Sequence, residues 1–196
     1  LKLATFYQGI QRPREAHKLL LRLLSKQPEN ENLILQVVSL EQNMGLNKQA
    51  KQRILETLEG NVPTEKMWQL WIELQLTQDA SKDVSADLIE MLSHFPASEW
   101  AGAKLAEIFL HDEKYAAAEK VIEKAMEEST ESASLKILWG RLLAIQGKWS
   151  EALTAFSSIE KNVGGVPLLN HQALTYRNLG KPHISLKLVE YSLLNH

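Results

Sequence analysis

Residues 139–156 read WGRLLAIQGKWSEALTAF, and this stretch decides the fold. Its apolar residues recur at helical spacing on both sides of Gly147, which indicates two amphipathic helices joined by a tight turn. Gly147 lies in the turn, where glycine can take the left-handed conformation that ends a helix. Small residues on the two helices, Gly140 and Ala152, allow them to approach closely. The stretch therefore predicts an antiparallel helical hairpin.

The same pattern recurs along the chain with one period. The small-residue position of the second helix falls at Ala16, Ala50, Val84, Ala118, Ala152 and Ser185, at intervals of 34, 34, 34, 34 and 33 residues. A second series lies upstream on the first helix, at Ala4, Val38, Ile72, Ala106, Gly140 and Ala173. Because proline cannot continue a helix, we expect the turns between hairpins at Pro28, Pro63, Pro96 and Pro167. Two series with one period indicate internal repeats.

These repeats predict an all-α protein, an α-solenoid in the form of a right-handed superhelix of about six helical hairpins. We expect a single array over residues 1–196. The repeats would span residues 1–30, 31–64, 65–98, 99–132, 133–165 and 166–196.

The pattern resembles the tetratricopeptide repeat (TPR) family, in which tryptophan, leucine and a small residue occupy the first helix, and alanine, an aromatic and alanine the second. The fourth repeat matches with Phe109 and Ala125, and the fifth with Trp139 and Phe156. The third repeat matches least, since Ile72, Val84 and Met91 stand where small residues belong, so we expect its two helices to be pushed apart. The half-a-tetratricopeptide and Sel1-like repeats remain alternatives.

Composition excludes several classes of function. The chain is 44% hydrophobic and 23% charged, as expected for a packed domain. A net charge of -2 provides no basic surface for phosphates, so we expect no nucleic acid partner. The absence of cysteine excludes disulfides and thiolate metal sites. No apolar stretch is long enough for membrane insertion.

Catalytic motifs are also missing. No two histidines lie three or four residues apart beside a carboxylate, so we expect no metal site and interpret the histidines as surface imidazoles: His17, His94, His111, His171, His183 and His196. Gly140 and Gly147 lack the spacing of a phosphate-binding loop. We therefore expect no enzyme, no catalytic residue and no cofactor.

One charged cluster has two possible interpretations, a docking surface or the solvated outer face of a second helix. Opposite charges three and four residues apart support one another, which favours the solvated face. The residues are Glu119, Lys120, Glu123, Lys124, Glu127 and Glu128.

The resemblance implies that the first helices line a concave groove. The groove positions of the family then correspond to Gln42, Lys66, Gln69, Glu73, Trp100, Glu107, His111, Arg141, Asn170 and Arg177, with Leu76, Leu110, Ile137 and Ile145 between them. We expect a groove that is acidic in its centre and basic toward its C-terminal end. The lysine, asparagine and arginine set of the chaperone-binding members cannot be placed on three consecutive repeats, which disfavours that role.

These observations favour a scaffold or adaptor that binds a partner peptide or helix, in a bacterial envelope, pilus or polysaccharide assembly. The expected location is the bacterial periplasm or a membrane-associated site, with the cytoplasm as the alternative. Because no polar capping helix is apparent, the chain is expected to be a fragment of a longer array or a homo-oligomer through uncapped ends. The alternatives are a self-associating structural oligomer and a regulatory array attached to a catalytic domain outside this fragment.

Overall fold

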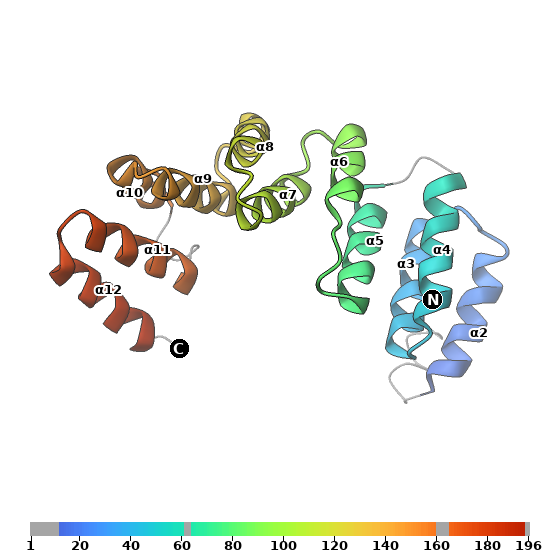
Figure 1. The fold of residues 1–196 in the computed structure, drawn as a ribbon. Helices are drawn as coiled ribbons and strands as arrows, with labels where there is room; N and C mark the ends of the chain where they lie inside the picture. Colours follow the sequence, from blue (N-terminus) through green and yellow to red (C-terminus); the bar gives the residue numbers. More distant parts are fainter. Residues whose placement is uncertain (1–11, 61–63, 160–164, 195–196) are drawn as a thin grey trace. The chain divides into compact units, whose positions relative to one another are not determined.

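The computed structural model describes residues 12–60, 64–159 and 165–194, and within them the chain is helical with no strand (Figure 1). Ala4 and Pro63 of the predicted pattern lie outside the described residues. The helices are α2 (Pro13–Leu24), α3 (Glu31–Asn43), α4 (Asn47–Gly60), α5 (Glu65–Gln78), α6 (Ser85–His94), α7 (Glu99–His111), α8 (Tyr115–Glu128), α9 (Ala133–Ile145), α10 (Trp149–Ser157), α11 (Gly165–Asn178) and α12 (Pro182–Leu194).

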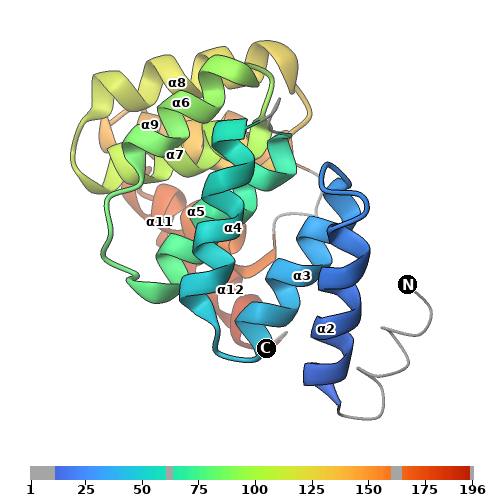
Figure 2. The ribbon, with the colours of Figure 1, turned by 90° about the vertical axis from the view of Figure 1, so that its right-hand side faces the viewer.

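The helices form hairpins in the predicted order. Helix α3 packs on α4, α7 on α8, α9 on α10 and α11 on α12. Consecutive hairpins also contact each other, since the second helix of one packs on the first helix of the next, as α2 does on α3 (Figure 2). The prediction of an all-α helical repeat is therefore confirmed.

First helices begin at a repeated cap. The side chains of Asn30, Thr64, Ser98 and Ser132, spaced by 34 residues, each accept a hydrogen bond from the backbone amide three residues later. Two of the caps also connect neighbouring repeats, because Thr64 donates to Glu31 at 2.8 Å and Ser132 donates to Glu99 at 2.5 Å. The caps thus fix both the start of a helix and its register against the previous repeat.

First helices end at a left-handed residue. Gly45, Gly147 and Gly180 have φ of 74°, 77° and 73°, as their positions in the pattern predict. In each turn the next amide donates to the carbonyl five residues back, for example from Lys148 to Leu143 at 2.9 Å, which satisfies a terminal carbonyl of the helix. The fourth repeat makes the same turn with Glu113 at φ 60°. Its backbone is strained, because a side chain disfavours this conformation.

The two series of small residues lie where the helices pack. Ala16, Ala50, Ala118 and Ala152 are completely buried. A Cβ atom added to Gly140 would lie 2.3 Å from Cε1 of Phe156, so glycine is required for the ring to pack there. The small residues therefore set the distance between the helices, as the sequence predicts.

The third repeat departs from the pattern at its turn. Asp79 stands where the second, fifth and sixth repeats have glycine, and its backbone is extended, with φ of -147°. Its carboxylate accepts hydrogen bonds from the amide and hydroxyl of Ser81, which lower the pKa of Asp79. Helix α8 of the fourth repeat begins at Tyr115, and the equivalent residue of the third repeat, 34 positions earlier, is Ser81. Helix α6 begins later than this, at Ser85. The chain divides into two compact units here, unit 1 (Leu1–Val84) and unit 2 (Ser85–His196).

Pro167 corrects one expectation. It was predicted in the turn between the fifth and sixth repeats, but it lies in the first turn of α11. Proline is tolerated there because the first amides of a helix have no carbonyl partner within it. Pro28 and Pro96 lie between helices, as predicted.

Candidate functional site

The first helices of unit 2 form one surface, since α9 contacts both α7 and α11. We call this surface the inner face and define it by side chains that these three helices leave open or half-buried. It contains predicted site residues together with Ile145 and Leu174, and comprises Glu107, His111, Arg141, Ile145, Asn170, Leu174 and Arg177. Trp100, at the start of α7, is half-buried.

The charges on the inner face are unevenly compensated. Lys104 lies 3.4 Å from Glu107 and offsets its charge, a neighbour that the sequence pattern did not indicate. Arg141 and Arg177 make no hydrogen bond or ion pair with the residues that the structure describes. Within unit 2 the inner face is therefore basic along α9 and α11.

Apolar side chains accompany these arginines. Ile145 is 48% exposed and Leu174 is 42% exposed. Leu110 was also expected in the groove, but it is only 5% exposed and packs in the core with Ala118 and Ile122, because its position on α7 faces the second helix. It is therefore not open to a partner.

His171 connects this face to the core. Its ring stacks on Phe156, with centroids 5.8 Å apart and planes inclined by 13°. Burial lowers the pKa of His171, and the charge of Arg141 lowers it further. The prediction of a surface imidazole is wrong for His171. It holds for His111, whose side chain is 90% exposed and lies 3.5 Å from Asp112.

The remaining predicted residues belong to unit 1. Gln42 on α3 is half-buried. On α5, Lys66 and Glu73 are exposed, and Gln69 is half-buried and donates to Glu65 at 3.4 Å. These four form a separate candidate set.

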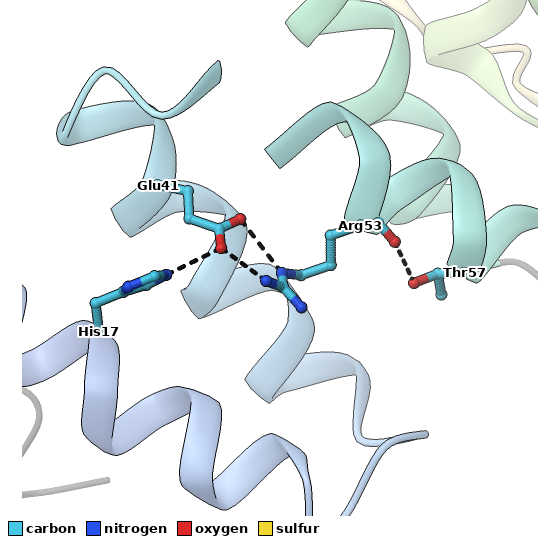
Figure 3. Close-up of polar contacts among 4 residues, drawn as sticks. All are labelled: His17, Glu41, Arg53 and Thr57. Atoms are coloured by element: carbon cyan, nitrogen blue, oxygen red, sulfur yellow. Dashed lines mark hydrogen bonds and ion pairs between the residues drawn. The ribbon is translucent and has the colours of Figure 1, made fainter. Parts of the chain in front are cut away.

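Unit 1 also contains a buried charge that sequence reasoning missed (Figure 3). Glu41 on α3 is completely buried, yet its carboxylate has two partners. Arg53 of α4 donates to Oε1 at 2.8 Å and to Oε2 at 3.2 Å, and Nε2 of His17 of α2 lies 2.9 Å from Oε1. Two hydrogen-bonded partners compensate for the loss of water around a buried carboxylate. Three helices from two repeats therefore meet at one carboxylate.

The signal for this cluster was present in the sequence. Glu41 occupies the repeat position of Phe109, Leu143 and Tyr176, so a charge stands where the repeats of unit 2 have a large apolar or aromatic side chain. The third repeat has the polar Gln75 there, which is also buried. Such a charge needs partners from neighbouring helices. The prediction of a surface imidazole is accordingly also wrong for His17, whose side chain is 13% exposed.

Residues 12–60, 64–159 and 165–194 contain no group of three or more histidines, aspartates or glutamates arranged to hold a metal ion. No helix in the same ranges combines the length and apolarity needed to cross a membrane.

Comparison with known proteins identifies the fold. No family model and no curated protein matches the sequence. Among solved structures, a tetratricopeptide repeat protein from Parabacteroides merdae superposes with a TM-score of 0.73 at 16% identity, over 98% of this chain and 77% of that chain. YrrB, described as a TPR protein with an unusual peptide-binding site, superposes with a TM-score of 0.65 at 14% identity, over 89% of this chain and 90% of that chain. PilW, described as a widely conserved type IV pilus biogenesis factor, superposes with a TM-score of 0.63 at 16% identity, over 95% of this chain and 87% of that chain.

These likenesses define the class of protein. The chain is a helical repeat protein, and its fold is that of the tetratricopeptide repeat proteins.

Proposed function

We propose that the chain is a protein-binding scaffold and that its inner face binds a segment of a partner protein. One observation carries the proposal. Arg141 and Arg177, which have no partner within the described part of the chain, lie on the same surface as the exposed Ile145 and Leu174. Apolar side chains beside uncompensated charges are typical of binding surfaces, since apolar burial supplies affinity and charge supplies specificity.

The partner segment that suits this surface carries apolar anchors and carboxylates. A carboxylate can accept two hydrogen bonds from one guanidinium, and Arg141 is half-buried, where such a bond is less screened than at an exposed site. We also propose that residues 1–196 function as one array. The candidate set of unit 1, which comprises Gln42, Lys66, Gln69 and Glu73, then makes contacts of its own with a partner. The peptide-binding site that the description of YrrB mentions belongs to that protein, and it supports the choice of a peptide as ligand here.

The test uses a phage-displayed library of random 16-residue peptides, selected on the full chain. Peptides that bind are measured by fluorescence anisotropy against the double variant Arg141→Glu with Arg177→Glu. We expect at least tenfold weaker binding, about 1.4 kcal/mol. The control is Glu123→Lys with Glu127→Lys on α8, which should leave these affinities unchanged. If every selected peptide tolerates the arginine variant, the inner face is not the binding surface.

Self-association through α12 is the second candidate, and a specific observation favours it. Val189 is 39% exposed, although its repeat equivalents Ile122 and Phe156 are buried under the next hairpin. Leu186 and Leu193 on the same helix are 60% and 71% exposed. A second copy could cover this surface. Light scattering should then show a dimer that Val189→Glu with Leu193→Glu converts to a monomer, and a wild-type monomer at 100 µM would reject this candidate.

A place in a bacterial envelope, pilus or polysaccharide assembly completes the proposal. Its support is the shared fold with PilW, whose description names pilus biogenesis for that protein. Fractionation of the native host tests it, because recovery of the protein in the cytosol alone would contradict an envelope role.

A further inference from the structure

A pocket of about 370 Å³ lies in unit 2, and none of the inner face residues lines it. Helices α6 and α8 both pack on α7 (Figure 2). Side chains of all three helices line the pocket. Its apolar lining includes Ile89, Leu92, Leu105 and Val121. Lys120 and Lys124, one turn apart on α8, complete it. This volume is sufficient for one or two large apolar side chains or a small ligand.

The pocket is lined on α7 by the smallest residue. Gly102 on α7 lies in the lining, and Ile34 and Lys136 occupy its position in the second and fifth repeats. A Cβ atom at Gly102 would lie 2.8 Å from Cβ of Ala125, so glycine allows α7 to approach α8 closely. In the fifth repeat Lys136 is only 12% exposed and pairs with Glu131 at 2.8 Å.

Ile89 gives the pocket an apolar entrance. Its side chain lines the pocket and is 54% exposed. A partner side chain that entered here would cover Ile89 and gain the free energy of apolar burial.

The charged side chains that line this pocket are of one sign. No carboxylate lines it. Lys120 and Lys124 are exposed and make no hydrogen bond or ion pair with any residue that the structure describes. A ligand that carries carboxylates would therefore meet two free ammonium groups beside an apolar surface.

The equivalent pocket of unit 1 shows that this chemistry does not come from the repeat. It has a volume of about 600 Å³ and is lined by residues two repeats earlier, such as Leu21, Leu24 and Pro28. There Arg53 is committed to Glu41, and Glu56 occupies the position of Lys124. Pockets at equivalent places in the repeat therefore differ in charge: the lining is basic in unit 2 and includes acidic side chains in unit 1.

We propose that the α6–α8 pocket of unit 2 is a second docking site, which takes an apolar side chain from an acidic amphipathic segment of a partner protein. The site is separate from the inner face. A scaffold with both sites can hold two segments at once.

The test again uses the displayed 16-residue peptide library on the full chain, with variants at the pocket. Ile89→Glu removes the apolar entrance, and Lys120→Glu with Lys124→Glu reverses the charge. Because all three side chains are exposed, these variants should fold, which circular dichroism checks. Lys181→Glu with Lys187→Glu is the matched control, since it makes the same charge change at exposed lysines on the α11–α12 hairpin.

We expect a class of acidic peptides with leucine or phenylalanine that both pocket variants weaken at least tenfold, while the control and the Arg141→Glu, Arg177→Glu variant leave their binding unchanged. The absence of such a class overturns the proposal. If the lysine variant loses peptide binding and Ile89→Glu does not, the proposal is also overturned. The attraction would then be a surface charge effect that does not use the pocket. Binding of dodecanoate at Ile89 by NMR, with no peptide class, would replace the peptide with a fatty acid. The arginine variant separates failure at this site from failure at the inner face.

Discussion

The two units handle the same packing position with opposite chemistry. In unit 1 the position on α3 holds Glu41, which is fully buried and bonded to Arg53 and His17. In unit 2 the corresponding residues are Phe109, Leu143 and Tyr176. The repeat therefore specifies where a side chain packs but not whether it is apolar. A charge is accepted there when neighbouring helices supply its partners.

The histidines extend the comparison. His17 in unit 1 lies against a carboxylate, whereas His171 in unit 2 stacks on Phe156 near Arg141. The positive charge of Arg141 disfavours the protonated imidazole of His171. Half-buried imidazoles of the two units are thus placed beside opposite charges.

The largest effect should follow from removal of an ionic partner in unit 1. Arg53→Met leaves Glu41 buried with His17 as its remaining partner, so we expect the free energy of unfolding to fall by about 3 kcal/mol. Urea denaturation followed by circular dichroism measures it. Arg22→Met is the control, because Arg22 is exposed on α2. Equal effects of the two variants would show that Glu41 does not depend on its arginine.

Overpacking in unit 2 should have the next largest effect. Ala118→Leu and Ala152→Leu insert bulk at completely buried positions, and we expect each to cost about 1–3 kcal/mol. Thermal denaturation measures the loss. Ala116→Leu on the exposed side of α8 should change little. Unchanged stability in both buried variants would contradict the assignment of these alanines to the helix contact.

A turn variant should stabilise unit 2. Glu113→Gly removes the strain of a side chain at φ 60°, and we expect a gain of about 0.5–1 kcal/mol after the entropy of glycine in the unfolded chain is subtracted. Asp79→Gly is the matched control at the same repeat position. Because Asp79 is extended and accepts bonds from Ser81, that change should give no gain. Equal gains at both positions would show that the turn conformation is not the cause.

The smallest effect concerns His171. Arg141→Gln removes the lesser of the two causes that lower its pKa, so the pKa should rise toward 6.5 without reaching it, as an NMR titration of the ring would show. The lowered pKa means that the unfolded chain binds more protons just below pH 6.5. Stability from this group is therefore complete above pH 6.5 and is lost as the pH falls toward the folded pKa. A pKa that does not move in the variant would exclude an effect of Arg141.

The sequence by itself determined the hairpins, their period and the small residues between helices. It also placed the left-handed turns at Gly45, Gly147 and Gly180. These features depend on residues close together in the chain, or on a position that recurs every 34 residues, so a single sequence displays them. The predicted inner face residues of unit 2 do lie on neighbouring helices, and their role in binding stays a prediction.

Only the tertiary structure decided which charges have partners. Glu41 is hydrogen-bonded to residues 24 positions before it and 12 positions after it. Lys104 offsets the charge of Glu107. Among the described residues, no ion pair is formed by Arg141, Lys120 or Lys124. The α6–α8 pocket likewise depends on side chains from three helices. The physical reason is that helical periodicity assigns a residue to a face of its own helix, but pairing and cavities depend on distances between side chains of different helices.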